Sequence, residues 1–241
     1  MKQSAFLLAA LCSGSLLVAS CNSDNTADSV ATTETTSPNA STAGDGAGMD
    51  HSTMNHGGTT ADTTSPLMAS MNEMMQKMEA TKPKGNTDHD FAHHMLEHHR
   101  GAVAMADIEL RDGKDATMRQ LAERIKADQQ KEIAELEAVA TRLDNAPTNY
   151  KPQDPTDPFT SQMKASMDGM MKNMPQLVAD PDMNFNMLMT VHHQSAVDMA
   201  KAELAHGRDT KLKEMAQQMI NAQQKEIQQF KDWHNQNADK M

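Results

Sequence analysis

The sequence predicts an all-α protein whose core is a four-helix bundle built from two tandem repeats, with extra short methionine-rich helices. Shifting the chain by 94 residues aligns 91–136 with 185–230 without a gap, which indicates a repeated structural unit. Apolar residues in both copies recur at helical spacing, and no stretch alternates with the period of two that a half-buried strand requires. Two helical hairpins of this kind can bury their apolar stripes against each other, which gives the bundle.

Each repeat is expected to contain a short methionine-rich helix, then a helix with a His-His pair, then a long amphipathic helix. The expected ranges are 67–80, 90–112 and 115–143 in the first repeat, and 159–174, 181–206 and 209–236 in the second. Asp180 can cap the helix that starts at Pro181, since Asp is favoured at the N-cap and Pro at the first helical position. Gly113 and Gly207 are expected to end the second helices in a left-handed conformation.

The helical domain is predicted to occupy residues 67–241. Its first repeat spans about 67–144, a proline-containing loop covers 145–158, and the second repeat spans about 159–236. The preceding residues 21–66 are rich in Thr, Ser, Ala, Asp, Asn and Gly, so burial of apolar surface cannot offset the entropy of ordering them. This segment is therefore predicted to be a disordered tether.

One tract in the tether departs from this composition. Two methionines and two histidines fall within eight residues, namely Met49, His51, Met54 and His56. Packing gives no reason for them in a linker, and they resemble the Met-Asp-His-Ser tracts of bacterial copper-resistance proteins. We treat them as further candidate metal ligands, with drift in a low-complexity segment as the alternative.

Residues 1–20 are typical of a secretory signal, because a basic Lys2 precedes an apolar stretch that is too short to span a bilayer. The stretch ends in Val18-Ala19-Ser20-Cys21, which resembles the cleavage box of bacterial lipoproteins, where the cysteine becomes the acylated N-terminus. We therefore expect an exported protein, lipid-anchored at Cys21 in the bacterial cell envelope and facing the periplasm, with the membrane as a partner only through this lipid. An ordinary secretory signal with an incidental cysteine is the alternative.

Charge and cysteine content exclude several classes of function. The formal net charge is −11, so the chain lacks the basic surface by which proteins bind nucleic acid or anionic lipid. The second cysteine, Cys12, lies within the predicted signal, so no thiol besides Cys21 remains for a disulfide, a thiolate metal site or nucleophilic catalysis. No motif supports a Ser-His-Asp or Cys-His arrangement, and the protein is not expected to be an enzyme.

The second helix of each repeat carries the candidate metal-binding face. Positions 95, 98 and 105 share one side of a helix, and small alanines between them leave room for an ion. The neighbouring His99 and His193 point about 100° away and can serve a second layer or a neighbouring helix. The candidate ligands are Met95, His98, His99, Met105, Met189, His192, His193 and Met199.

These donor types select copper. Between Leu67 and Met241 the chain has 20 Met and 10 Leu, whereas packing alone favours Leu, since Met specifies a core poorly. Thioethers with imidazoles bind Cu(I), while the carboxylate clusters that Ca²⁺ or Mg²⁺ require are lacking. The nitrogen-rich first repeat suits Cu(II) or Cu(I), and the sulfur-rich second repeat suits Cu(I). The further candidate ligands are His89, His93 and His94 in the first repeat, and Met183 and Met187 in the second.

The repeated motif also resembles a known family. Each His-His pair is followed by Ala and Met, and later by Gln-x-x-Glu-Ile, which together resemble the ferritin-like family of secreted bacterial proteins known as domain of unknown function 305. Over residues 67–236 the chain is similar to periplasmic copper-binding proteins. The resemblance implies a helical bundle that binds copper ions for sequestration, resistance or homeostasis, and it carries over to the His pairs and their adjoining methionines.

Other interpretations have less support. His94, Glu97 and His98 match the His-x-x-Glu-His pattern of inverted zinc peptidases, but the second repeat has Leu188 and Val191 in place of the first two. The serious alternative is a structural or partner-binding envelope lipoprotein with a methionine-rich core and no stoichiometric metal, because flexible methionines also suit adaptable protein docking. Its protein partner is unknown.

A di-iron site of the ferritin type needs Glu-x-x-His on facing helices. Glu97 and Glu109 in the second helix of the first repeat do not have a histidine three residues on. This site is therefore not expected.

Overall fold

The computed structural model describes residues 65–240, most of which lie in six α-helices. They are α1 (Pro66–Ala80), α2 (Thr87–Asp112), α3 (Ala116–Leu143), α4 (Pro158–Lys172), α5 (Pro181–His206) and α6 (Thr210–Gln236), followed by the short 3₁₀ helix η2 (Ala238–Lys240). No strand occurs within residues 65–240. The all-α fold is confirmed, and the helices agree closely with the ranges that the sequence predicts.

Several predictions for the N-terminal part fall outside the described residues. They are the signal over 1–20, the lipidated Cys21, and the tether with Met49, His51, Met54 and His56. At the end of the predicted tether, Pro66 is already the first residue of α1. Among the residues that the structure describes, no helix is both long enough and apolar enough to cross a membrane.

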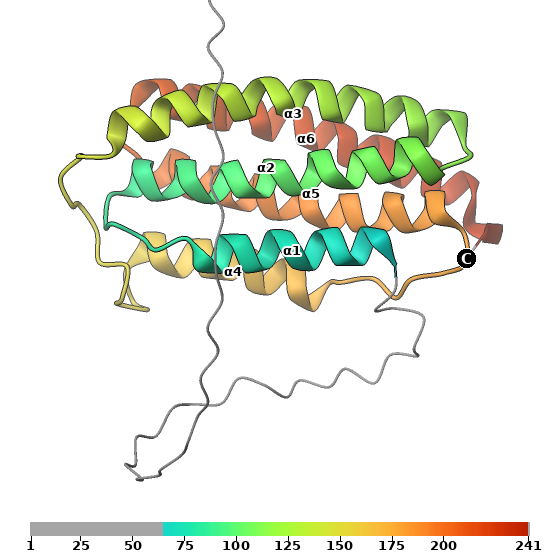
Figure 1. The fold of residues 1–241 in the computed structure, drawn as a ribbon. Helices are drawn as coiled ribbons and strands as arrows, with labels where there is room; N and C mark the ends of the chain where they lie inside the picture. Colours follow the sequence, from blue (N-terminus) through green and yellow to red (C-terminus); the bar gives the residue numbers. More distant parts are fainter. Residues whose placement is uncertain (1–64, 241) are drawn as a thin grey trace, which may run out of the picture. The chain divides into compact units, whose positions relative to one another are not determined.

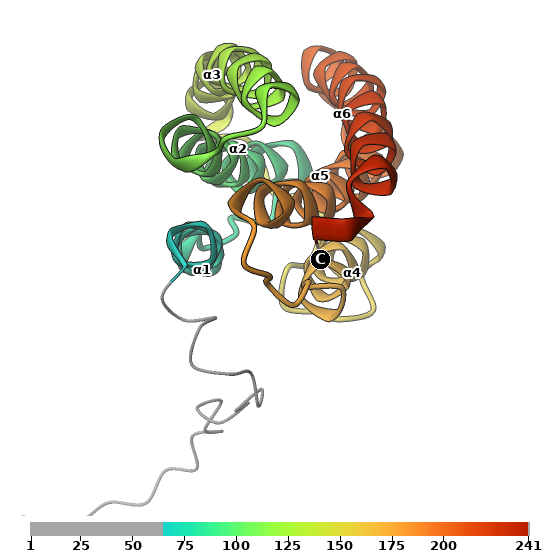
Figure 2. The ribbon, with the colours of Figure 1, turned by 90° about the vertical axis from the view of Figure 1, so that its right-hand side faces the viewer.

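Helices α2 and α5 lie side by side at the centre of the domain, and each of the other α-helices packs on one of them. Figure 1 shows the helices running side by side, and the end-on view in Figure 2 shows α3 and α6 on one side of the central pair with α1 and α4 on the other. Helices α1 to α3 form the first repeat and α4 to α6 the second, related by an approximate two-fold axis between α2 and α5. The four long helices form the core and the short methionine-rich helices cover its flank, as the repeat predicts.

The helices begin where side chains can cap them. Asp180 accepts a hydrogen bond of 2.8 Å from the N–H of Met183, with Pro181 in the first turn of α5, as expected. Asp115 and Asp209 cap α3 and α6 in the same way. Each carboxylate satisfies a backbone donor that helix geometry leaves without an internal acceptor.

A reciprocal pair of aspartates joins the two repeats. Asp88, in the first turn of α2, accepts hydrogen bonds of 2.7 and 2.6 Å from the backbone N–H groups of residues 208–209, between α5 and α6. Asp182, in the first turn of α5, accepts two hydrogen bonds of 2.8 Å from the N–H groups of residues 114–115, between α2 and α3. Each repeat therefore stabilises the turn inside the other.

Gly113 and Gly207 end α2 and α5, but not in the left-handed conformation expected of them. Their φ angles are −67° and −64°, which any residue can adopt. Space requires glycine there instead, because a Cβ on Gly113 would collide with the Glu109 carboxylate and lie 2.6 Å from the Glu109 carbonyl oxygen. Gly207 stands in the same relation to Glu203. The expectation was wrong because it considered backbone conformation and not the room that a buried side chain needs.

Methionines of α1 cover the flank of α2. Met71, Met74 and Met78 are buried, and a Cβ on Gly101 of α2 would lie 2.6 Å from the sulfur of Met74. Gly101 thus allows α1 to approach α2 closely. The equivalent position in α5 is Ser195, which is also buried.

Replacing Gly113 by alanine should destabilise the fold by about 1–3 kcal/mol, because the added methyl group overpacks the end of α2 against Glu109. The matched control is Gly169→Ala in α4, where no described atom lies within 4 Å of the added Cβ. That change should instead stabilise the protein by about 0.5–1 kcal/mol, since alanine is the better helix former. Urea denaturation measures the change in the free energy of unfolding for both variants. If Gly113→Ala did not destabilise the protein, this role of Gly113 would be contradicted.

Candidate metal centre

The two equivalent histidines His98 and His192 meet at the centre of the domain. Their ring centroids are 3.7 Å apart with an interplanar angle of 34°, and both side chains are 0% exposed. The His192 Nε2–H donates to the carbonyl oxygen of His98 over 3.0 Å. Burial holds the pKa values of both rings well below the usual histidine range, and neighbouring histidines lower them further. The pair is therefore neutral at pH 7.

Three ring nitrogens of this pair lack hydrogen-bond partners among the described residues: both nitrogens of His98 and Nδ1 of His192. A buried polar atom left unpaired costs about 1–3 kcal/mol, so native structures usually give it a partner. Each neutral imidazole has one nitrogen with a free lone pair, which is the form that binds a metal. The centre thus has ring nitrogens that could bind a metal ion and that have no partner within residues 65–240.

Four methionines accompany the histidine pair on the same faces of α2 and α5. We call the six residues the seam: Met95, His98, Met105, Met189, His192 and Met199. All four methionine side chains are fully buried. The first methionine of each helix stands one turn before the histidine and the second stands two turns after it. The structure therefore brings the two predicted histidines into contact and buries the four predicted methionines on the same helix faces.

His99 and His193 point away from the seam, each toward a glutamate of its own repeat. His99 Nε2 lies 2.7 Å from Glu132 Oε2 on α3, and His193 Nε2 lies 2.8 Å from Glu226 Oε2 on α6. The second contact is at ion-pair distance but is not aligned as a hydrogen bond. These histidines join the central helices to the outer helices.

The Gln-x-x-Glu motif of the repeat supplies these glutamates. Its glutamines, Gln129 and Gln223, are also buried. Sequence reasoning noted the motif as a repeat but did not identify the glutamates as partners of the histidines. The signal that could have identified them is that the histidine and the glutamate both recur at the same shift of 94 residues.

A second group of histidines gathers where the start of α2 meets the end of α3. One ligand atom from each of His89, His93 and Asp144 lies within 4.8 Å of the others. His89 Nδ1 lies 2.7 Å from Asp90 Oδ1. His94 does not join them, because its Nδ1 lies 2.8 Å from the Asp90 carbonyl oxygen. Burial lowers the pKa of His93, and the nearby ring of His89 lowers it further.

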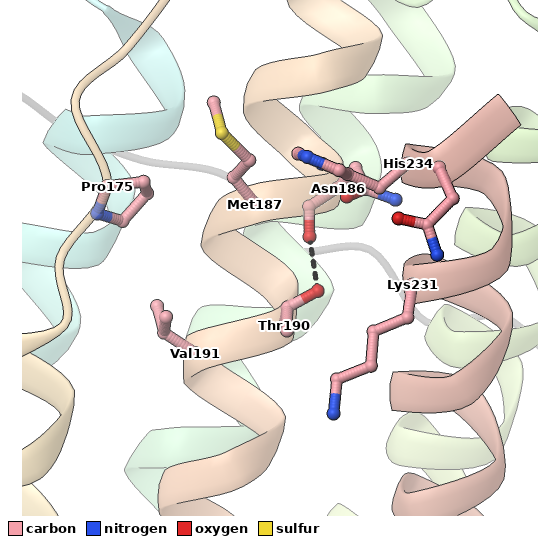
Figure 3. Close-up of a pocket in the computed structure, with 8 residues that line it drawn as sticks. Pro175, Asn186, Met187, Thr190, Val191, Lys231 and His234 are labelled. Carbon is pink, nitrogen blue, oxygen red and sulfur yellow. Dashed lines mark hydrogen bonds between the residues drawn. The ribbon is translucent and has the colours of Figure 1, made fainter. Parts of the chain in front are cut away.

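The equivalent region of the second repeat has sulfur in place of nitrogen. Met183 is fully buried, whereas Met187 lines a surface pocket of about 420 Å³ between α5 and α6. Figure 3 shows residues that line this pocket, among them Met187 and Thr190 on α5 and His234 on α6. This pocket does not include any seam residue, so we do not assign the central site to it.

The His-x-x-Glu-His pattern does not form a peptidase site. Glu97 pairs with Arg100, His94 faces a backbone carbonyl, and His98 lies in the seam. The three side chains therefore have different partners.

Glu203 and His206 do have the Glu-x-x-His spacing that the sequence analysis sought in the first repeat. The Glu203 carboxyl faces Asp88, and the ring of His206 lies edge-on to Phe159 at 6.3 Å. In the described part of the chain they do not gather with a third His, Cys, Asp or Glu ligand.

Two buried carboxyl pairs stand at the far ends of the central helices, Glu109 with Asp182 and Glu203 with Asp88. Burial raises the pKa of Glu109 from 4.5 to about 9, and the neighbouring Asp182 adds to the shift. Burial and the charge of Asp88 raise the pKa of Glu203 to about 9 in the same way. Because these pKa values lie well above 7, Glu109 and Glu203 are neutral at pH 7.

Fold and site together define a two-repeat, all-helical protein with a buried centre of imidazoles and thioethers. The family described as "Domain of unknown function (DUF305)" matches residues 28–140 and again residues 88–234. The chain belongs to this family. A comparison with curated proteins gave no match.

Three solved structures illustrate the similarity. The chain is 25% identical to CopM in its Cu(I)-bound form, over 62% of this chain and 96% of CopM, with a TM-score of 0.47. Silver-soaked CopM gives the same identity and coverage with a TM-score of 0.48. A DUF305 fragment from Deinococcus radiodurans is 26% identical, over 64% of this chain and 99% of the fragment, with a TM-score of 0.47.

The stability of the protein should fall as the pH rises from 7 to 9. Glu109 and Glu203 bind a proton more tightly in the folded state than in the unfolded state, so their contribution is complete below about pH 4.5 and is lost as the pH rises through about 9. The double variant Glu109→Gln, Glu203→Gln keeps the shape and cannot ionise. Its free energy of unfolding, measured by urea denaturation, should depend less on pH above pH 7 than that of the parent. This range is chosen because histidines of the unfolded chain are already mostly neutral there and contribute little to the slope. An identical slope in parent and variant would rule out this linkage.

Proposed function

We propose that this protein binds copper ions in the bacterial cell envelope and serves in copper sequestration, resistance or homeostasis, not in catalysis. The observation that carries the proposal is the stacked His98–His192 pair, which is buried, neutral and only partly hydrogen-bonded by residues 65–240. A soft metal ion between α2 and α5 would use the lone pairs that these rings offer.

The charge of the centre favours Cu(I) over a divalent ion. Transfer of an ion from water into a protein interior becomes much less favourable as its charge increases, unless a counter-charge accompanies it. The six seam residues are all neutral, and neutral thioether and imidazole donors are those that Cu(I) prefers. The donor set therefore fits a monovalent copper ion.

The residue types of the seam also support a ligand role. Leucine would fill the same positions with fewer accessible conformations and would define the core better. Methionine instead provides a polarizable sulfur. Four buried methionines at equivalent positions of a repeated face are thus better explained by donor chemistry than by packing alone. Because the seam is fully buried, loading would require a local opening of the helices.

A partner-binding role finds less support, because it would need methionines on the surface. Among the described residues, the large apolar side chain that is clearly exposed is Met171, at 51%. Most methionines of α1, including Met71, Met74 and Met78, are buried within the domain. Stoichiometric copper binding would distinguish the two functions, since the partner-binding protein would bind none.

We also propose that the protein is exported and is held at a membrane surface by lipid on Cys21. The basic residue, the short apolar stretch and the small residues before Cys21 support this location. On the basis of the sequence, a tether of some forty residues would then connect the lipid to the helical domain. Copper binding does not depend on this anchor.

Replacing Met95 and Met189 by leucine should lower the amount of bound Cu(I) while leaving the protein folded. Leucine keeps nearly the same volume, so the change in stability should be under about 1.5 kcal/mol per site, but the thioether is lost. Substitution of His98 and His192 by alanine should lower the copper stoichiometry further. Titration of the full-length protein with Cu(I) against a competing chelator measures the loss, and circular dichroism confirms the helical fold.

The matched control for this experiment is Met71→Leu with Met78→Leu in α1. These side chains are as buried as those of the seam, but they lie outside it, so copper binding should not change. If the Met95, Met189 variant bound Cu(I) as tightly as the parent, the seam methionines would be ordinary core residues.

Mass spectrometry of the mature protein should identify Cys21 as the first residue, carrying lipid. Cys21→Ser should release the protein from the membrane fraction without changing its copper stoichiometry, since the anchor and the helical domain are separate in sequence. Cleavage at another bond, or an unmodified Cys21, would refute the lipid anchor.

A further inference from the structure

The two repeats differ in chemistry at the cluster formed by His89, His93 and Asp144. The first two positions correspond to Met183 and Met187 in the second repeat, so symmetry of the core does not explain the histidines. One ligand atom from each cluster residue lies within 4.8 Å of the others. We propose that this cluster is a second metal site, separate from the seam, that binds a divalent transition-metal ion and holds Cu(II) most tightly.

His89 offers a lone pair to this site. Its side chain is only 3% exposed, and Nε2 has no hydrogen-bond partner in the described part of the chain. Nδ1 lies 2.7 Å from Asp90 Oδ1 and must carry the proton that this contact needs. The lone pair is therefore on Nε2, which is 3.5 Å from Asp144 Oδ1.

His93 completes the pair of imidazoles. Its ring centroid lies 4.3 Å from that of His89, and its buried Nε2 is likewise without a partner within residues 65–240. A structural ion pair between His89 and Asp90 would not explain why the Nε2 atoms of both rings remain unpaired, in two rings whose centroids are 4.3 Å apart. A shared cation explains it.

Asp90 is the positioning residue of the site. Its carboxylate accepts hydrogen bonds from the Lys84 and Gly85 N–H groups at 2.9 and 2.8 Å, and from the Tyr150 hydroxyl at 2.7 Å. It is thus fixed on one side while it orients His89 on the other. Carboxylate–histidine–metal arrangements of this kind set the tautomer and direction of the ligand ring.

The donor set identifies the class of ion. Two imidazoles and one carboxylate suit borderline divalent metals such as Zn(II) and Cu(II), and Cu(II) generally binds a given nitrogen and oxygen site more tightly. The carboxylate supplies negative charge that the seam lacks. Asp144 is exposed and caps the C-terminal end of α3, where the helix dipole favours a cation. An ion can therefore enter from solvent without opening the core.

A cation already occupies the neighbourhood of Asp144. The Lys84 ammonium lies 2.9 Å from Asp144 Oδ1 and 3.2 Å from its carbonyl oxygen. A metal ion must compete with this ammonium for the same carboxylate. Removal of the lysine charge should therefore strengthen metal binding, which is the opposite of what loss of a ligand would do.

The test is equilibrium dialysis of the full-length protein with Zn(II) and with Cu(II). The background carries His51→Ala and His56→Ala, so that the N-terminal tract does not contribute. His93→Gln should lower the stoichiometry by one ion and remove the nitrogen hyperfine structure of this site from the Cu(II) electron paramagnetic resonance spectrum. His94→Gln is the matched control, since this neighbour bonds a backbone carbonyl instead of joining the cluster, and it should bind as the background does.

Two more variants give graded results. Lys84→Met should tighten Zn(II) binding by about two- to fivefold, the range of a surface ion pair. Asp90→Asn should weaken it by about 10- to 100-fold without changing the final stoichiometry, as expected for a residue that orients a ligand. Asparagine fits this position, because Asn184 accepts the Val178 N–H at the equivalent place of the second repeat.

The site is refuted if His93→Gln binds the same number of ions as the background, or if His94→Gln loses the ion equally. Weaker binding by Lys84→Met would also overturn it. Failure here is distinguishable from failure of the proposed Cu(I) function, because the Met95, Met189 double variant should retain the divalent ion while losing Cu(I). His93→Gln should do the reverse.

Discussion

The contact between α2 and α5 is the constraint on which the rest of the domain depends. Large parts of both helices are buried against their neighbours, so the polar side chains that lie there must find partners inside the protein or remain unpaired at a cost in free energy. Asp88 and Asp182 satisfy turns of the opposite repeat, and His99 and His193 reach glutamates of the outer helices. After these contacts are made, three imidazole nitrogens of His98 and His192 still lack a partner among the described residues where the central helices meet.

The sequence was sufficient to predict the helices because a gapless repeat presents the same pattern twice. It also predicted that His98 and His192 share a face with methionines, since helical spacing alone determines which residues share a side. It also predicted that His99 points away from this face, but it did not identify Glu132 as the partner, because that contact depends on how α3 packs. Nor did it identify Asp144, which is distant in sequence from His89 and has no repeated counterpart to mark it. The end of α2 at Gly113 was assigned the wrong conformation, because the sequence does not show that the Glu109 side chain is buried against this glycine.

The residues that are identical in the two repeats and the residues that differ lie in different parts of the domain. The shared residues line the two-fold axis, where His98 and His192 must fit against each other. The residues that differ lie away from this axis, where His89 and His93 are replaced by Met183 and Met187. A change near the axis affects both halves at once, whereas a change at the periphery affects one. Different metal preferences can therefore develop at the edges of the domain without disturbing its centre.

The reciprocal hydrogen bonds of Asp88 and Asp182 have a consequence for cooperativity. Neither repeat contains the acceptor that its own helix-connecting turn uses, so neither half can unfold and leave the other intact. The domain should melt as one unit despite its duplicated sequence. A chain with a single repeat could complete the same hydrogen bonds only by pairing with a second copy about a two-fold axis. The tandem duplication thus gives one polypeptide the bonding pattern of a symmetric dimer, with an association that does not depend on protein concentration.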